Sequence, residues 1–113
     1  MNYFLKIILS SVSVMLGAYL LPGVDIKDFW SALVVAIVLS FLNFLVKPLL
    51  IVLTIPLTVI TLGLFLVVIN AIIILLADSL VSGFYVDGFF WALLFSILLS
   101  IINWILTDLS KSK

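Results

Sequence analysis

Four long intervals without a charged residue constrain this chain more than any other feature. They span residues 7–24, 29–46, 48–77 and 88–107. A helix needs roughly 20 apolar residues to cross the ~30 Å hydrocarbon core of a bilayer, so each interval is long enough for one crossing. With 67% hydrophobic residues and a mean hydropathy of +1.60, the chain could not stay soluble as an isolated domain. The sequence therefore predicts an all-α integral membrane protein with four transmembrane helices.

The third interval is longer than one crossing requires, and two prolines stand near its start. Pro48 and Pro56 each lack the backbone N–H that a helix interior uses, so they would break or kink a helix. We expect a membrane span at about residues 58–78, preceded by an apolar, Pro-broken connector at about residues 48–58. The connector could be a re-entrant or interfacial segment, or a kinked extension of the following helix. In either case, nearby threonines could bond the freed backbone groups: Thr54, Thr58 and Thr61.

The second half of the chain repeats the first at an offset of 60 residues. Gly23, Phe29, Ala32, Leu33, Ile37, Leu39, Ser40 and Asn43 recur as Gly83, Phe89, Ala92, Leu93, Ile97, Leu99, Ser100 and Asn103. We expect one domain, 1–113, built from two helical hairpins: repeat 1 at about 3–47, with spans at about 5–22 and 29–46, and repeat 2 at about 59–107, with spans at about 58–78 and 88–107. Because two spans return the chain to its starting side, the hairpins would be parallel repeats, related by an axis along the membrane normal.

Lysines and aspartates separate to opposite ends of the predicted spans. One set of ends carries Lys6, Lys47, Lys111 and Lys113, whereas the opposite loops carry Asp25, Asp28, Asp78 and Asp87 with Lys27 as their cation. The positive-inside rule then places both termini and the connector in the cytoplasm, as expected for a multi-pass protein of the bacterial cytoplasmic membrane. The first span lacks a small-x-small cleavage site before Pro22, so we expect it to be retained.

Small and polar residues form a stripe along one face of the second span and of the fourth. The second span has Ala32, Ala36, Ser40, Asn43 and Lys47 at spacings of four, four, three and four, and the fourth has Ala92, Ser96, Ser100, Asn103 and Thr107 at the same spacings. Small residues let helix backbones approach closely in lipid, where van der Waals contact and hydrogen bonds drive association. We expect these stripes to be seams between helices.

Asn43, Asn70 and Asn103 are the most polar residues predicted at depth in the membrane. Each could line a water-filled path, or could donate a hydrogen bond to a neighbouring helix. Such interhelical bonds contribute about 0.6 to 2 kcal/mol, which is enough to select a packing register. We favour the packing role, because Asn43 and Asn103 share a face with Ala and Ser.

The composition excludes most catalytic chemistry. The chain contains no His, Cys, Glu or Arg, and no Ser or Thr has a nearby base. The four loop aspartates could gather into an acidic patch, and carboxylates bind hard cations, but their spacing fits no calcium loop. We therefore expect no enzyme, no catalytic or metal-binding residue and no cofactor. The balanced charge of five Lys and five Asp gives no case for nucleic acid.

A succession of short motifs resembles a known family. The motifs are Asn43, Lys47-Pro48-Leu49-Leu50, Leu53-Thr54-Ile55-Pro56-Leu57, Thr61-Leu62-Gly63-Leu64-Phe65 and Asn70. They resemble the four-transmembrane phage-holin-like family, also called mycobacterial-type holin superfamily IV, over nearly the whole chain. The resemblance implies a small bacterial membrane protein, with Lys47, Pro48, Pro56, Thr61 and Gly63 as motif positions.

The sequence is compatible with two functions. In the first, the lipid-embedded chain associates with copies of itself and alters membrane permeability, as the family name implies. In the second, it is a non-conducting structural or accessory protein, for example an envelope-stress partner that contacts another membrane protein. The absence of charged residues inside the predicted spans supports the second alternative.

Overall fold

The computed structural model describes residues 2–111, with side chains as far as Leu109. Its elements are α1 (Tyr3–Leu20), β1 (Val24–Ile26), α2 (Phe29–Leu53), α3 (Ile55–Ile60), α4 (Phe65–Leu80), β2 (Phe84–Val86) and α5 (Phe89–Lys111). Lys113, which supported the predicted orientation, lies outside the described residues. The predominance of helix agrees with the prediction.

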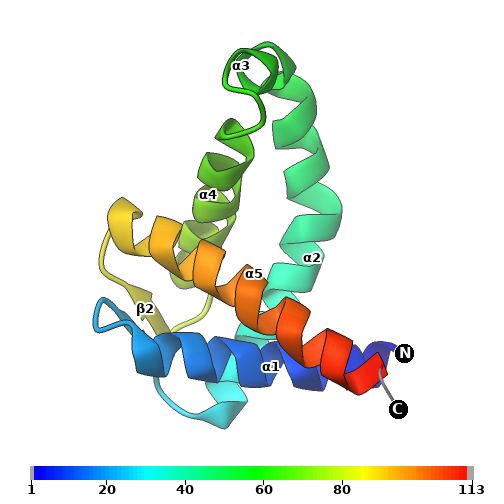
Figure 1. Cartoon of the computed structure of the whole chain (residues 1–113). Helices are drawn as coiled ribbons and strands as arrows, with labels where there is room; N and C mark the ends of the chain where they lie inside the picture. Colours follow the sequence, from blue (N-terminus) through cyan, green and yellow to red (C-terminus); the bar gives the residue numbers. More distant parts are fainter. Residues whose placement is uncertain (1, 112–113) are drawn as a thin grey trace.

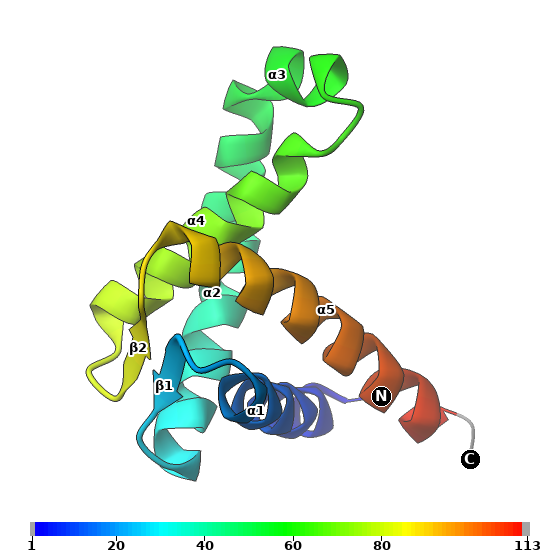
Figure 2. The ribbon, with the colours of Figure 1, turned by 60° about the vertical axis from the view of Figure 1, so that its left-hand side comes forward.

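The helices form two arms that meet where the strands lie (Figure 1). In one arm α2 packs against α4, and α3 joins them at the far end; in the other arm α1 packs against α5. Each arm also contacts the other, because α1 packs against α2 and α4 against α5. A view turned by 60° shows the same divergence away from the strands (Figure 2). Both ends of the described chain and α3 therefore lie at arm ends remote from the strand pair.

Two short strands, which an all-helical prediction did not include, link the halves of the chain. β1 and β2 pair antiparallel, with Val24 opposite Val86, Asp25 opposite Tyr85 and Ile26 opposite Phe84. Two further backbone bonds flank the pair, from Lys27 N to Gly83 O (2.8 Å) and from Asp87 N to Gly23 O (2.7 Å). Three residues are too few to show the alternation that identifies a strand in sequence. The pairing holds the loop after α1 against the loop after α4.

The element boundaries follow the 60-residue offset between the halves. α1 ends at Leu20 and α4 at Leu80, and α2 begins at Phe29 and α5 at Phe89. The strand register is also symmetric under this offset, because Asp25 lies opposite its own counterpart, Tyr85. The orientation of the hairpins in a membrane stays a prediction.

The buried core lies at the junction of the arms, beside the strands. The Phe84 and Phe95 rings pack 5.7 Å apart at a tilt of 48°, and both are almost fully buried. Gly17 faces Phe95, leaving no room for a side chain there. Valine, isoleucine and alanine from all four long helices fill the rest: Val14, Val35, Ile74, Ala77 and Ala92. The core thus closes the narrow end of the space between the arms.

Two predicted span limits do not coincide with helix limits in the structure. α2 continues through Pro48 to Leu53, whereas we expected the second span to end at about residue 46 and a connector to begin at residue 48. A proline can be accommodated inside a membrane helix when neighbouring groups satisfy the freed carbonyl. The predicted span at 58–78 is also not one helix, because residues 61–64 separate α3 from α4. Leu62 (φ 57°) and Gly63 (φ 89°) adopt left-handed conformations that a helix does not contain.

The threonines around α3 differ in their hydrogen bonding. Thr54 Oγ1 donates to Leu50 O (2.7 Å), and Thr61 Oγ1 donates to Leu57 O (2.9 Å). Thr61 Oγ1 also accepts from Phe65 N (3.1 Å), so this residue helps to begin α4. Thr58 Oγ1, in contrast, is buried without a partner among the described residues. A re-entrant or interfacial position of the connector, expected at about residues 48–58, stays a prediction.

Candidate functional site

A polar cleft lies between the two arms. We define it by its lining residues, which come from α2, α4 and α5: Leu39, Asn43, Lys47, Asn70, Ile73, Ile74, Ser96, Leu99, Ser100 and Asn103. Its volume is about 170 Å³. The cleft forms because the two arms diverge away from the strand pair (Figures 1 and 2).

The three asparagines singled out in the sequence all line this cleft, each from a different helix. Asn103 Oδ1 accepts a hydrogen bond from Ser13 Oγ of α1 at 3.3 Å, which links α1 to α5. Within the described part of the chain, the side chains of Asn43 and Asn70 have no hydrogen-bond partner. Asn103 therefore takes part in helix packing, whereas Asn43 and Asn70 present free amide groups to the cleft.

Each small-residue stripe divides into a buried part and an open part. Ala32, Ala36, Ala92 and Ser96 are buried near the strand pair. Ser40, Asn43 and Ser100 are exposed. The expected close helix contacts thus exist at the closed end of the stripes and at Asn103, through its bond to Ser13. Ser40, Asn43 and Ser100 instead face the hollows between the arms.

Lys47 supplies the positive charge of the cleft. It lies one helical turn beyond Asn43 and is half-buried. Because α2 continues six residues beyond it, Lys47 is not the last residue of its helix. A long aliphatic stem lets such a side chain keep its ammonium group in a polar environment.

A second hollow, the side groove, opens beside the polar cleft. Its lining comes mainly from α1 and α2: Tyr3, Lys6, Ile7, Ser10, Ile37, Ser40, Phe41, Asn43, Phe44 and Asn103. Its volume is about 660 Å³, and Asn43 and Asn103 line both hollows. Sequence reasoning missed Lys6 and Ser10 as site residues, although their spacing of four already places them on one face of a helix.

The aspartates at the strand end serve local structure. Asp28 caps α2 by accepting from Ser31 N (2.9 Å), and this hydrogen bond lowers the pKa of the Asp28 carboxyl. The Tyr85 hydroxyl donates to Asp87 (3.2 Å), which raises the pKa of the tyrosine. Asp78 accepts from Val86 N (3.2 Å) and so ties α4 to β2. Among the described residues, no group of three or more such side chains could hold a metal ion.

The motif residues divide between two regions: Asn43, Lys47 and Asn70 line the cleft, whereas Pro48, Pro56, Thr61 and Gly63 lie toward or around α3. Pro48 lies inside α2, and Pro56 lies in the first turn of α3, where its missing N–H has no helical partner. Thr61 and Gly63 form the break between α3 and α4. These residues shape the connection at the far end of the α2–α4 arm.

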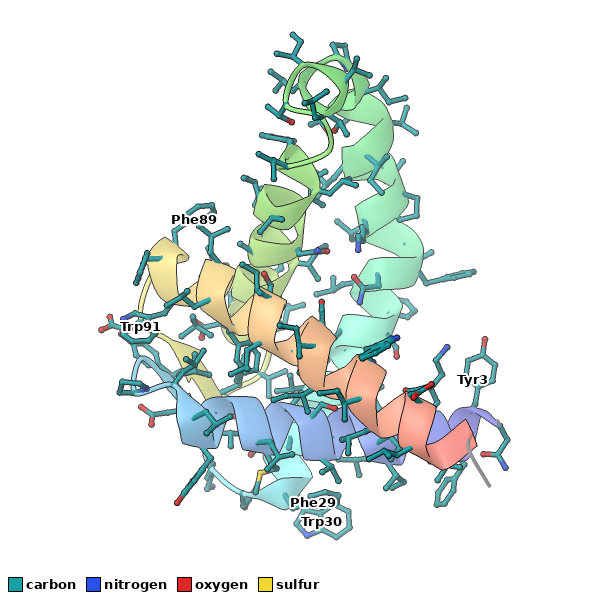
Figure 3. The ribbon with its side chains drawn as sticks, in the orientation of Figure 1. Tyr3, Phe29, Trp30, Phe89 and Trp91 are labelled. Carbon is teal, nitrogen blue, oxygen red and sulfur yellow. The ribbon has the colours of Figure 1, made fainter. Side chains whose placement is uncertain are left out.

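The outer surface is that of a membrane protein. In the part of the chain that the structure describes, three helices are long and apolar enough to cross a bilayer, namely α1, α2 and most of α5, and the apolar α4 is shorter, with 16 residues. Large aromatic side chains stand at the helix ends: Figure 3 shows Phe29 and Trp30 at the start of α2, Phe89 at the start of α5, and Tyr3 at the opposite end of the α1–α5 arm. The fold and its exposed apolar faces define a small helical integral membrane protein.

The chain belongs to the family described as Mycobacterial 4 TMS phage holin, superfamily IV, which matches residues 1–105. It is 41% identical over 101 residues to "Uncharacterized membrane protein YvlD" of Bacillus subtilis (strain 168), covering 82% of this chain and 85% of the relative. It is 36% identical over 115 residues to "Uncharacterized protein SCO3922" of Streptomyces coelicolor (strain ATCC BAA-471 / A3(2) / M145), covering 93% of this chain and 92% of the relative. No solved structure matches the chain.

Proposed function

We propose that this protein associates with copies of itself in the bacterial cytoplasmic membrane and alters its permeability through the polar cleft. The observation that carries the proposal is the convergence of Asn43, Asn70 and Asn103 with Lys47 on one hollow. An amide without a protein partner is costly in hydrocarbon, because nothing there replaces its hydrogen bonds to water. The free amides of Asn43 and Asn70 therefore favour a hydrated cleft.

In this proposal the chain crosses the membrane four times, as two parallel hairpins related by an axis along the membrane normal. The termini and α3 are cytoplasmic, and the strand pair lies on the opposite side. The placement of the lysines and of the arm ends supports this orientation. With 16 residues, α4 alone is about 24 Å long, so the apolar residues of α3 and of the α3–α4 break would reach into the inner leaflet.

The cleft of a single chain does not reach the strand end, which is why the proposal includes self-association. Leu39 and Ile73 line its inner part and are buried, and Phe95 fills the core beyond them. A continuous polar path therefore requires a second copy beside the cleft or a separation of the arms. The outer apolar residues of α2 and α5 offer surfaces for such contacts, for example Leu45 and Ile105, which occupy equivalent positions in the halves.

The direct test is membrane-potential dye fluorescence in bacteria during induced expression. We expect depolarisation by the natural protein and its loss in the double variant Asn43→Leu with Asn103→Leu, because leucines would replace two cleft amides. The matched control is Ser82→Leu, an exposed position in the loop at the strand end, which should depolarise normally. Membrane abundance must be equal in all three. Undiminished depolarisation by the double variant would contradict a pore lined by these asparagines.

The closed inner end of the cleft favours a second candidate, a non-conducting accessory protein. If the core at Phe95 never opens, the chain acts only through contacts with another membrane protein. The potential would then stay steady at high, verified abundance, and crosslinking would capture a different protein rather than copies of this chain. Recovery of self-crosslinks alone would count against this candidate.

A further inference from the structure

We propose that the side groove binds an anionic phospholipid, with the lipid phosphate held near Asn43 between Lys6 and Lys47. This inference does not rest on the proposed change in permeability. Asn43 lines both hollows, Lys6 lines the side groove and Lys47 lines the adjoining polar cleft. The two cations therefore line adjoining hollows that share Asn43, and they come from different helices, α1 and α2.

The polar end of the groove matches the hydrogen-bonding needs of a phosphate. Lys6 and Ser10 lie one turn apart on α1, and Ser40 and Asn43 line the facing side on α2. Ammonium, hydroxyl and amide groups all donate hydrogen bonds, which phosphate oxygens accept. None of the residues that line either hollow is acidic. Asp108, near the end of α5, is exposed and lines neither hollow.

The other wall of the groove is apolar, which distinguishes a lipid from a free phosphate. Ile37, Phe41 and Phe44 lie at spacings of four and three on α2, and they are 48%, 63% and 76% exposed. Residues at these spacings share one face of a helix, so they form a continuous strip beside the polar end. An acyl chain would cover this strip, whereas a free phosphate would leave it bare.

The position of the groove along the helices suits a lipid headgroup. Lys6 is the fourth residue of α1, and Lys47 can extend its aliphatic stem toward the same end of the molecule. This is the end that carries most of the lysines and that faces the cytoplasm in our orientation. The cytoplasmic leaflet is rich in anionic lipid, and basic pockets between membrane helices on this side bind anionic headgroups.

Native mass spectrometry of the full-length protein in detergent tests the site directly. The protein is titrated with phosphatidylglycerol and with phosphatidylcholine of identical acyl chains, and we expect tighter binding of phosphatidylglycerol. Lys6→Gln and Lys47→Gln should each weaken its binding roughly five-fold, as expected for one lysine near an anionic headgroup. Lys27→Gln is the matched control, because it removes the same charge at the strand end, and it should leave binding unchanged.

Two further arms keep the test decisive. Glycerol phosphate, which has the headgroup charge but no acyl chains, should not displace the lipid at equal concentration. Phe44→Ala should weaken binding of both lipids, because it shortens the apolar wall, and it keeps the proposal testable if a lysine variant fails to fold. Equal affinity for the two lipids, an equal loss in Lys27→Gln, or displacement by glycerol phosphate would each overturn the proposal.

Discussion

At the scale of single residues, two glycines mark where the halves of the chain approach most closely. Gly23, after α1, lies against the Trp91 ring of α5, and Gly83, after α4, lies against Ser31 of α2. A Cβ atom at either position would overlap the facing side chain.

We expect Gly23→Ala to destabilise the protein more than Gly83→Ala. The added methyl group would meet the rigid indole of Trp91, and overpacking of this kind costs about 1 to 3 kcal/mol. At Gly83 the nearest obstacle is the Ser31 hydroxyl, which can rotate away, and the Ser31 Cβ behind it requires only a small shift. Thermal unfolding followed by circular dichroism in detergent measures both variants. Equal melting temperatures would show that the Trp91 contact is not as tight as the structure places it.

At the scale of elements, the β1–β2 pair joins the two hairpins through backbone hydrogen bonds, in addition to the packing of α1 against α5 and of α2 against α4. It connects residues about 60 positions apart in the sequence, and its flanking backbone bonds run from each loop to the other. Loops that connect membrane helices are ordinarily free to separate, whereas these two are fixed to each other. The pairing thus fixes the two hairpins to each other at the strand end, where the arms meet, and the arms diverge away from it.

A cysteine pair tests this pairing, because the natural chain contains no cysteine. Asp25 and Tyr85 are both exposed and lie directly opposite each other in the register. Directly opposed residues in antiparallel strands have Cβ atoms about 4.5 to 5.5 Å apart, close enough for a disulfide after a small adjustment. We expect Asp25→Cys with Tyr85→Cys to close an intramolecular disulfide under mild oxidation, seen as faster migration on a non-reducing gel.

The control for this experiment is Asp25→Cys with Ser82→Cys, which places the second thiol in the same loop but outside the strand pair. It should crosslink much more slowly. Comparable rates in the two double variants would mean that the loops are close but not held in the observed register.

At the scale of the whole molecule, the strand pair and α3 lie at opposite ends of the α2–α4 arm (Figures 1 and 2). With four crossings, these two ends lie on different sides of the membrane. The orientation that the lysines predict puts the strand pair outside and α3 inside. Both regions offer exposed positions, Tyr85 in β2 and Leu62 after α3.

Thiol labelling of single-cysteine variants measures this orientation. In spheroplasts, a membrane-impermeant maleimide should label Tyr85→Cys at once, whereas Leu62→Cys should react only after the membrane is permeabilised. The reverse pattern would invert the orientation, and labelling of both positions in intact spheroplasts would contradict a membrane crossing by α4 between them. Equal labelling after detergent solubilisation controls for the reactivity of each thiol.

Much of the architecture could be predicted because it depends on local composition. Apolar intervals of membrane-spanning length identify helices without reference to the rest of the fold. The rule that proline ends a helix failed at Pro48, because α2 continues through it. The strand pair could not be predicted, since three residues carry no detectable pattern and their partner lies about 60 residues away. Lys6 and Ser10 were missed because the side groove depends on how α1 lies beside α2.

The sequence by itself determined that the chain is an apolar helical protein, that its halves match at a fixed offset, and that Asn43 and Asn103 share helix faces with small residues. Only the tertiary structure decided that those faces close near the strands and open further along the helices. Periodicity defines which residues lie on one face of a helix, but not the angle at which two helices cross. That angle depends on contacts between distant segments, such as Phe95 against Gly17. Because the helices diverge beyond these contacts, the outer part of each predicted seam lines a polar hollow.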